Sequence, residues 1–232
     1  MQDYFREKEP AINIENTLPV ARPGIIFILI SLALFLVCLI GDWELPRNLF
    51  FLLTLFVAWF FRDPKRPTPP EGFGLSPADG RIIRIEDLAD NPYTHGPAKK
   101  VSIFMNVLNV HVNRIPADGR LLSQTYHPGA FVNASFDKAS ESNERNALVL
   151  ETSEGLIGVV QIAGLIARRI VSWVDDGIVV QRGQRFGMIR FGSRVDLYLP
   201  PDSEIMVAID QKVSAGWSPI WRKADTSNKE SV

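Results

Sequence analysis

The sequence predicts a mostly β protein of the α+β class, with a barrel-sandwich-like β domain that follows an N-terminal hydrophobic helical hairpin. Three observations predict it: two uncharged apolar runs within the first 61 residues, a proline-rich stretch after them, and then short apolar runs bounded by turn residues. We therefore expect a membrane-associating segment over residues 1–62, a linker over residues 63–72 and a β-rich domain over residues 73–232.

The two apolar runs differ in length. Residues 23–41 contain no ionisable side chain, and neither do residues 48–61. A bilayer core needs about 20 helical residues, so the first run can span it, whereas the second spans only at the boundary or returns within one leaflet. A signal peptide fits poorly because no small-residue cleavage site follows the first run. A pair of buried core helices is the alternative.

The charges around the two runs predict their orientation. Arg22 precedes the first run and Arg62 follows the second, whereas Asp42 and Glu44 lie between them. Basic outer flanks favour a hairpin with both ends in the cytoplasm.

Short apolar runs after residue 62 predict strands over residues 101–107, 147–150, 156–162 and 195–199, and residues 153–155 read as a hairpin turn. No long amphipathic helix is predicted in this part of the chain.

Composition excludes several kinds of function. The net charge of −1 offers no electrostatic argument for a nucleic-acid partner. Cys38 is the one cysteine and lies within the first apolar run, so no internal disulfide or zinc spacing is present. No metal site is predicted, and the common hydrolase, metalloprotease and nucleotide-binding motifs are absent.

The tetrapeptide Pro-Ala-Asp-Gly occurs twice, ending at Gly80 and at Gly119. Each copy is a suitable turn before a strand, because proline restricts φ and glycine accepts positive φ. From these local sequences neither Asp79 nor Asp118 has the stronger claim to a chemical role.

Three histidines are present. His95 and His127 lie beside prolines and glycines in predicted loops, whereas His111 lies in a long β-like run over residues 101–116. A lone histidine in a strand is more often structural than catalytic.

The segment GMIRFGSRVDLYLP over residues 187–200 resembles the processing site of the phosphatidylserine decarboxylase proenzymes, with Gly192-Ser193 as the cleavage site. The resemblance covers roughly residues 60–200 in matching order, and the short chain with its hairpin is similar to the compact bacterial branch. Its other matching segments are residues 76–80, 111–116, 143–145, 160–162 and 183–193.

The resemblance implies a self-cleaving enzyme. Ser193 would attack the Gly192 carbonyl, and elimination and hydrolysis would leave a covalent pyruvoyl group (pyruvate) at position 193 as the cofactor. The products would be chains 1–192 and 193–232, held as a heterodimer. The enzyme would decarboxylate phosphatidylserine in the membrane to phosphatidylethanolamine and CO₂ through a Schiff base, at the cytoplasmic face of a bacterial inner membrane.

The resemblance also implies a Ser/His/Asp arrangement for activating Ser193. Asp79 matches the aspartate by its turn. Longer relatives carry two histidines three residues apart and use the second as the base; here His111 matches the first and Arg114 stands at the second position. Because arginine keeps its proton, either His111 assumes the role or activation is arranged differently. We favour His111.

Two further functions stay open. One is a pyruvoyl decarboxylase of another amine substrate. The other is a non-enzymatic membrane-tethered adaptor with a sandwich-hybrid domain, in which the chain remains whole. A homo-oligomer is compatible with either.

Overall fold

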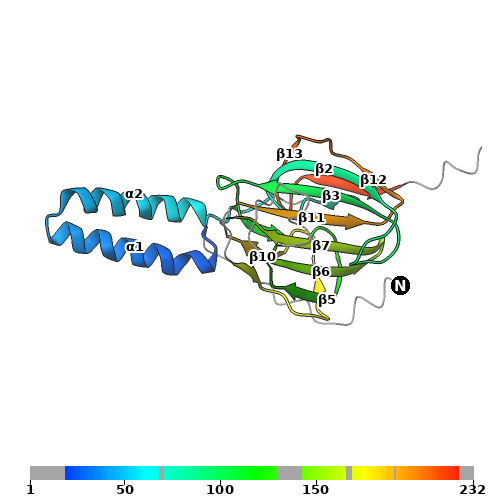
Figure 1. Cartoon of the computed structure of the whole chain (residues 1–232), viewed down its shortest axis with the longest axis horizontal. Helices are drawn as coiled ribbons and strands as arrows, with labels where there is room; N and C mark the ends of the chain where they lie inside the picture. The colour runs from blue at the N-terminus through cyan, green and yellow to red at the C-terminus, as the bar shows by residue number, and fades with distance from the viewer. Residues whose placement is uncertain (1–18, 68–70, 130–142, 166–168, 191, 225–232) are drawn as a thin grey trace, which may run out of the picture. The chain divides into compact units, whose positions relative to one another are not determined.

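The structure is a computed structural model that describes residues 19–67, 71–129, 143–165, 169–190 and 192–224. The chain separates into two compact units, which we describe one at a time. One unit contains both helices, residues 108–110 and an isolated β-bridge between Val20 and Arg62. The other unit contains the strands of the sheets. Figure 1 identifies the elements by label and colour.

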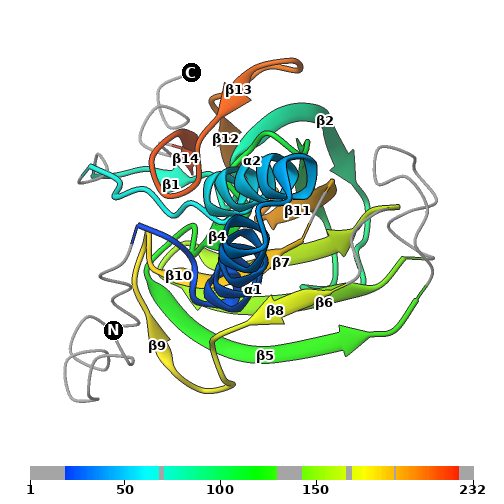
Figure 2. The same ribbon diagram turned by 90° about the vertical axis from the view of Figure 1, so that its left-hand side faces the viewer.

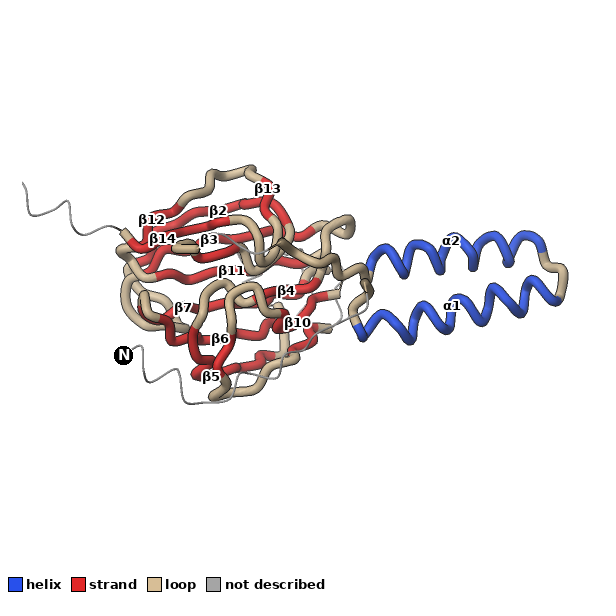
Figure 3. Tube along the Cα trace, turned by 180° about the vertical axis from the view of Figure 1, so that it is seen from behind, coloured by secondary structure: helices blue, strands red, loops and turns tan. Residues whose placement is uncertain are grey.

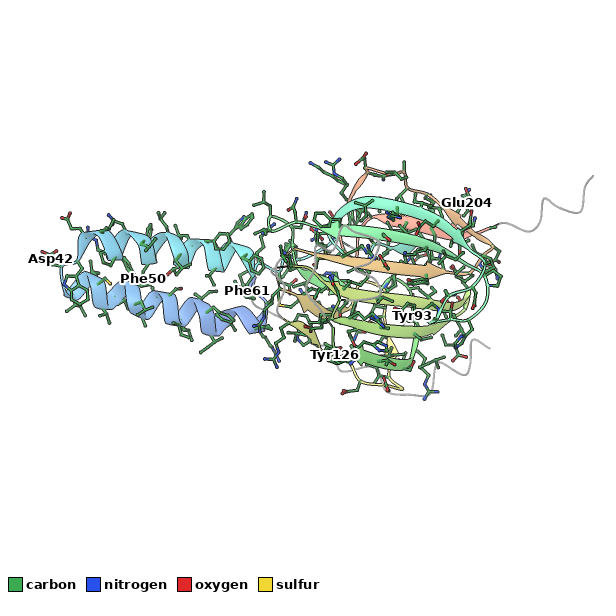
Figure 4. The ribbon with its side chains drawn as sticks, viewed as in Figure 1. Asp42, Phe50, Phe61, Tyr93, Tyr126 and Glu204 are labelled. Atoms are coloured by element: carbon green, nitrogen blue, oxygen red, sulfur yellow. The ribbon has the colours of Figure 1, made fainter. Side chains whose placement is uncertain are left out.

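The helical unit is a hairpin of α1 (Arg22–Ile40) and α2 (Glu44–Phe60). The chain reverses at Asp42, which adopts a positive φ of 54°, and both Asp42 and Phe61 are labelled in Figure 4. Close packing at the other end requires Gly24, because an added Cβ would lie 2.3 Å from Cγ of Phe61. The ring of Phe27 stacks on that of Phe61 with centroids 5.6 Å apart. The predicted helical hairpin is confirmed.

Both helices present large apolar side chains outward, including Ile26, Leu29 and Val37 on α1 and Leu49, Leu52 and Leu55 on α2. Their polar side chains are satisfied locally: the hydroxyl of Thr54, for example, donates to the carbonyl of Phe50 at 2.8 Å. Among the described residues, α1 is the one helix whose length and composition suit it to cross a membrane. With 17 residues, including Glu44 and Arg47 in its first turn, α2 is shorter and more polar at its start.

The β unit is built from one large and two small antiparallel sheets, seen from three directions in Figures 1, 2 and 3. The large sheet has the order β13-β2-β3-β11-β7-β6-β5-β9 and curls strongly in Figure 2. The small sheets have the orders β4-β10-β8 and β1-β14-β12. The predicted mostly β architecture with an N-terminal helical pair is confirmed.

The strands of the large sheet are β2 (Gly80–Leu88), β3 (Ala98–Met105), β5 (Gly119–His127), β6 (Arg145–Thr152), β7 (Gly155–Ala163), β9 (Val179–Val180), β11 (Ser193–Leu199) and β13 (Lys212–Val213). The small sheets consist of β4 (Val112–Arg114), β8 (Ile170–Ser172) and β10 (Arg185–Ile189), and of β1 (Gly74–Leu75), β12 (Ser203–Ile205) and β14 (Pro219–Lys223).

The main core lies on the inner face of the curled sheet. Alternate residues of β11, Val195, Leu197 and Leu199, are buried there with residues from β3 and β7. The largest buried side chain is that of Trp221, whose indole N–H donates to the Glu154 carboxylate at 3.0 Å. Because side chains alternate along a strand, Ser193 shares this inner face with Val195 and Leu197.

The structure corrects the predicted long strand around His111. Strand β3 ends at Met105, residues 106–111 form a turn and connection, and β4 begins only at Val112. Asn106 and Asn109 interrupt the apolar run, and asparagine favours turns because its side chain competes for backbone hydrogen bonds. His111 therefore lies just before a strand and not within one.

The two Pro-Ala-Asp-Gly segments adopt the same structure, a bend followed by a strand that begins at the glycine. Neither glycine has positive φ, so the predicted reason for glycine is wrong. An added Cβ at Gly80 would lie 2.2 Å from the carbonyl oxygen of Phe104, and one at Gly119 equally close to that of Glu151. Close approach to the neighbouring strand is the reason for glycine at both positions.

Candidate active site

Ser193 begins the central strand of the large sheet. It is fully buried between β3 and β7, where it pairs with Met105 on one side and Ala163 on the other. Its hydroxyl donates to the sulfur of Met105 at 3.5 Å. The nucleophile that the sequence predicts is therefore ordered, desolvated and hydrogen-bonded to a weak acceptor.

Gly192 lies in a half-buried bend directly before this strand. Among the residues that the structure describes, an added Cβ would meet no atom within 4 Å outside the adjacent residues. Packing against this part of the chain therefore does not require glycine at this position. Gly192 differs in this respect from Gly80, where a side chain cannot fit.

A chain of three buried amides leads to the serine. The amide of Asn146 donates to the Gln161 carbonyl oxygen at 3.0 Å, and the Gln161 amide donates to that of Asn113 at 2.8 Å. The amide nitrogen of Asn113 then lies 3.7 Å from the Met105 sulfur, the same atom that accepts from Ser193. The amide chain and the Ser193 hydroxyl therefore meet at one sulfur atom, that of Met105.

Asp79 lies at the same end of the large sheet as Ser193. Residues Arg81, Phe104 and Arg194 occupy one row across β2, β3 and β11. Two strand spacings amount to about 10 Å, which separates the start of β2 from the start of β11. One carboxylate oxygen of Asp79 accepts from the Arg66 guanidinium at 2.7 Å and from the backbone N–H of Ala215 at 2.8 Å.

Asp118 lies at the opposite end of the sheet, although its local sequence matches that of Asp79. It precedes Gly119, which pairs with Thr152 at the end of β6 remote from Ser193. Its carboxylate accepts from the backbone N–H of Arg182 at 2.7 Å. Both aspartates thus tie a neighbouring loop to a turn, but only Asp79 does so near Ser193.

His111 is buried immediately before β4. The carbonyl of His111 accepts from the backbone N–H of Ile189 at 3.4 Å, and Ile189 lies four residues before Ser193 in the sequence. Asn113 lies two residues after His111. The hydrogen bond described for Ser193 goes to Met105, and those described for Asp79 come from Arg66 and Ala215. None of these hydrogen bonds forms part of a direct Ser/His/Asp relay.

Arg114, at the position of the base in longer relatives, points to a different partner. Its guanidinium donates to the carbonyl of Gly183 at 3.0 Å, and its backbone N–H donates to that of Pro77 at 2.9 Å. Its side chain packs so closely on Gly216 that an added Cβ there would lie 2.6 Å from Cδ. Arg114 holds three loops together, and as a permanent cation it is no general base.

Asn143 and Glu144, which lie in one of the segments that resemble the family, hold the end of β7 beside Ser193. The amide of Asn143 donates to the carbonyl of Ala163 at 2.7 Å, and the N–H of Ala163 donates to the Glu144 carbonyl at 2.9 Å. The Glu144 carboxylate also interacts with the phenol of Tyr126, a residue labelled in Figure 4. Burial, and then the charge of Glu144 and its hydrogen bond, raise the pKa of the Tyr126 phenol.

The remaining histidines lie elsewhere. His95 and His127 line a hollow of about 380 Å³ together with Arg145 and Tyr93. Along β5 and β6, the residues that line this hollow, among them His127 and Arg145, alternate with residues of the inner face such as Asn146. Because neighbouring side chains of a strand point to opposite faces, the hollow lies on the outer face of the sheet. Neither histidine is a candidate partner of Ser193.

Sequence reasoning missed Met105 and Asn113. The available signal was the position of Asn113, a polar residue within an apolar segment and two residues after His111. Met105 carried no signal, because a methionine in an apolar strand is ordinarily core packing.

The fold and the site together define a β-sheet enzyme domain that is joined to an apolar helical hairpin and carries a glycine–serine pair at the start of its central strand. The sequence model of the family described as "Phosphatidylserine decarboxylase" matches residues 53–220. The chain belongs to the phosphatidylserine decarboxylase family, and the predicted classification as a decarboxylase is confirmed.

Curated relatives agree over most of the chain. The phosphatidylserine decarboxylase proenzyme of Syntrophus aciditrophicus is 50% identical over 207 residues, which cover 87% of this chain and 96% of the relative. The proenzyme of the same name from Aromatoleum aromaticum is 54% identical over 200 residues, covering 84% and 91%. That of Magnetococcus marinus is 45% identical over 206 residues, covering 88% and 94%.

Proposed function

We propose that this decarboxylase is a proenzyme that cuts itself between Gly192 and Ser193 and then converts phosphatidylserine to phosphatidylethanolamine and CO₂. One observation carries the proposal: Ser193 is fully buried at the start of the central strand, after a glycine that packing against the described residues does not require. A glycine without such a packing role is consistent with a need for access to its carbonyl carbon.

Cleavage begins when Ser193 Oγ attacks the Gly192 carbonyl carbon. The C–N bond breaks, the serine nitrogen takes up the proton that Oγ gives up, and the peptide becomes an ester. β-Elimination, in which Ser193 loses its α-proton and the Gly192 carboxylate leaves, then divides the chain into residues 1–192 and 193–232 and leaves dehydroalanine at position 193. Tautomerisation of this residue to an imine and hydrolysis by one water molecule, with release of ammonia, give the pyruvoyl group. The two products stay together as a heterodimer because β11 of the shorter chain pairs on both sides with strands of the longer chain.

The cofactor is the pyruvoyl group that forms from Ser193 itself. The surroundings of Ser193 suit a neutral carbonyl group, since the Met105 thioether contacts its hydroxyl, the Asn113 amide contacts the same sulfur, and no described carboxylate is hydrogen-bonded to Ser193. The ketone of such a group accepts the substrate's amine and withdraws the electrons that remain when CO₂ leaves. The chain's own role is to exclude water and hold position 193 between β3 and β7.

His111 is the proposed proton carrier in cleavage, and Asp79 its supporting carboxylate. The burial of His111 beside the strand that leads to Ser193, and the location of Asp79 at the same end of the sheet, support these roles. Activation then requires Asp79 to exchange its contact with Arg66, because the two are joined by an ion pair of 2.7 Å.

The proposed site of action is the membrane that contains the substrate. The length and apolar surface of α1 support attachment to a bilayer, with residues 1–62 as the membrane segment, residues 63–72 as a linker and residues 73–232 as the catalytic domain. The charges that flank the hairpin support the cytoplasmic side of a bacterial inner membrane.

Intact mass measurement of the full chain tests the proposal. We expect two fragments divided between Gly192 and Ser193, the shorter one blocked by a pyruvoyl group, and an uncut, inactive Ser193→Ala variant. Activity is measured with phosphatidylserine in vesicles and, separately, with soluble amino acids. An intact, inactive wild-type chain would favour a membrane-tethered adaptor, and a preference for soluble amines would favour a different decarboxylase.

A further inference from the structure

We propose that Asn113 supplies the hydrogen-bond donor that stabilises the oxyanion formed on the Gly192 carbonyl when Ser193 attacks it. The inference rests on the proposed self-cleavage and adds a residue to it. Asn113 is fully buried on β4 and shares the sulfur of Met105 with the attacking hydroxyl.

The hydrogen-bond chain determines which end of the Asn113 amide faces the Met105 sulfur, the atom that accepts from the Ser193 hydroxyl. Its oxygen accepts from Gln161, whose own oxygen accepts from Asn146, so the NH₂ group of Asn113 is directed at the Met105 sulfur. Reversing all three amides would bring the Asn113 oxygen against that sulfur. Two acceptors would then be in contact inside the protein, which is unfavourable without water to separate them.

The amide chain depends on a second glycine of the processing segment. Gly187 on β10 pairs with Asn113, and an added Cβ would lie 3.2 Å from the amide nitrogen of Gln161 and 2.4 Å from the carbonyl oxygen of Val171. The missing side chain gives Gln161 room to reach across from β7 to β4. The orientation of Asn113 is thus built from three strands and one glycine.

In the uncut protein the N–H donor of the Asn113 amide has only a weak acceptor, the Met105 sulfur. A thioether sulfur is a weak acceptor, and both the Asn113 N–H and the Ser193 O–H are directed at it. An oxyanion is a far stronger acceptor, and hydrogen bonds to a charged oxygen are roughly twice as strong as neutral ones. The interaction therefore strengthens as the reaction proceeds, which is the requirement for lowering a barrier.

Conversion of the Gly192–Ser193 peptide bond into an ester consumes and releases no other molecule. A bond forms between Oγ and the Gly192 carbonyl carbon, and the C=O electron pair moves onto the oxygen, where Asn113 donates to it. The C–N bond then breaks as the nitrogen takes up the proton from Oγ, and the carbonyl re-forms as an ester. Asn113 keeps its protons throughout. The Met105 side chain, with several rotatable bonds, can move its sulfur aside.

The test is Asn113→Asp, which keeps the shape and the acceptor for Gln161 but replaces the donor with an oxygen. Full-length chain is made by cell-free synthesis with detergent micelles, and cutting is followed by gel and intact mass. We expect cleavage about 100-fold slower than in the wild type, the usual effect of removing one oxyanion donor. The matched control is Asn91→Asp, which removes the donor of another buried amide, in the loop before β3 and outside the amide chain, and for which we expect a much smaller effect.

Hydroxylamine, which cleaves esters, identifies the slow step. If Asn113 acts on ester formation, hydroxylamine leaves the slow cutting of Asn113→Asp unchanged. Rapid hydroxylamine cleavage between Gly192 and Ser193 in this variant would show that the ester forms normally, and would overturn the inference. Cleavage of Asn113→Asp at the wild-type rate, or equal slowing in Asn91→Asp, would overturn it as well.

Folding of each variant is checked by near-UV circular dichroism and protease resistance against Ser193→Ala. Should the buried charge of Asn113→Asp prevent folding, Asn113→Ala removes the donor without adding a charge, and the same loss of rate is expected. A wild-type chain that is not cut at all contradicts the proposed function itself. A cut wild type with a normally cut Asn113 variant contradicts only this inference.

Discussion

The hydroxyl of Ser193 donates to the sulfur of Met105 at 3.5 Å, on the inner face of the large sheet. This contact holds the hydroxyl on a weak acceptor and leaves its proton in place. A serine in this state needs both a proton acceptor and a rearrangement of Met105 before it can attack a carbonyl.

Met105→Leu is therefore expected to accelerate cleavage several-fold, because the hydroxyl loses the partner that holds it at rest. The two side chains have similar volumes, so the cost in stability should stay below about 1.5 kcal/mol. The rate of cutting after cell-free synthesis measures the effect. Cutting that becomes slower would instead make the sulfur contact a requirement of the reaction.

Gly192→Ala should fold normally, since an added Cβ meets nothing within 4 Å, yet it should be cut more slowly because the methyl group lies beside the attacked carbonyl. The control is Gly80→Ala, whose Cβ would lie 2.2 Å from the Phe104 carbonyl oxygen and which should lose stability. Melting temperature and fraction cut are measured for both. Normal cutting of Gly192→Ala would remove the chemical reason for this glycine.

Asp79→Asn and Asp118→Asn form a matched pair. Each carboxylate accepts one backbone N–H, so both substitutions should lower the free energy of unfolding by about 1 to 3 kcal/mol. Only Asp79→Asn should slow cleavage, since only Asp79 lies at the Ser193 end of the sheet. Urea unfolding of uncut Ser193→Ala backgrounds gives the stabilities, and equal cutting rates in the two variants would exclude Asp79 from the reaction.

His111→Ala should slow cleavage by about 100-fold or more, the typical contribution of a general acid–base residue. His127→Ala, which changes a histidine on the outer face, is the control and should be cut like the wild type. The cut fraction is followed across pH 5 to 9. A normally cut His111→Ala variant would assign proton transfer to another group.

Glu86 gives a prediction for pH. Burial alone would raise the pKa of its carboxyl, but the charges and hydrogen bonds of Lys100 and Arg84 outweigh burial and hold the pKa below 4.5. A depressed pKa contributes stability above the unfolded-state value, and this contribution is lost as the pH falls through the folded-state value. Glu86→Gln should therefore destabilise the folded protein at pH 7, by about 1 kcal/mol for this partly buried pair, and have little effect near pH 3. Urea titrations at both pH values check it.

Local pattern was sufficient for the helical hairpin. In a lipid bilayer the backbone of a long uncharged run must form its hydrogen bonds internally, as a helix does, so residues 23–61 carry their own structural signal. The Gly192-Ser193 pair is locally only a glycine–serine turn; the resemblance of several segments in a constant order singled it out, and its role stays a prediction.

The resemblance favoured Asp79 over Asp118, but only the tertiary structure gave the physical difference between them, because identical turns carry no information about which end of the sheet they occupy; strand pairing decides that. The meeting of Asn113, Gln161 and Met105 was decided by the tertiary structure alone, since these residues lie on three strands and touch only after the sheets pack together. Local sequence patterns thus determined the helical hairpin and the β-rich class of the domain. Long-range register determined the neighbours of Ser193, since those contacts join residues that the sequence keeps far apart.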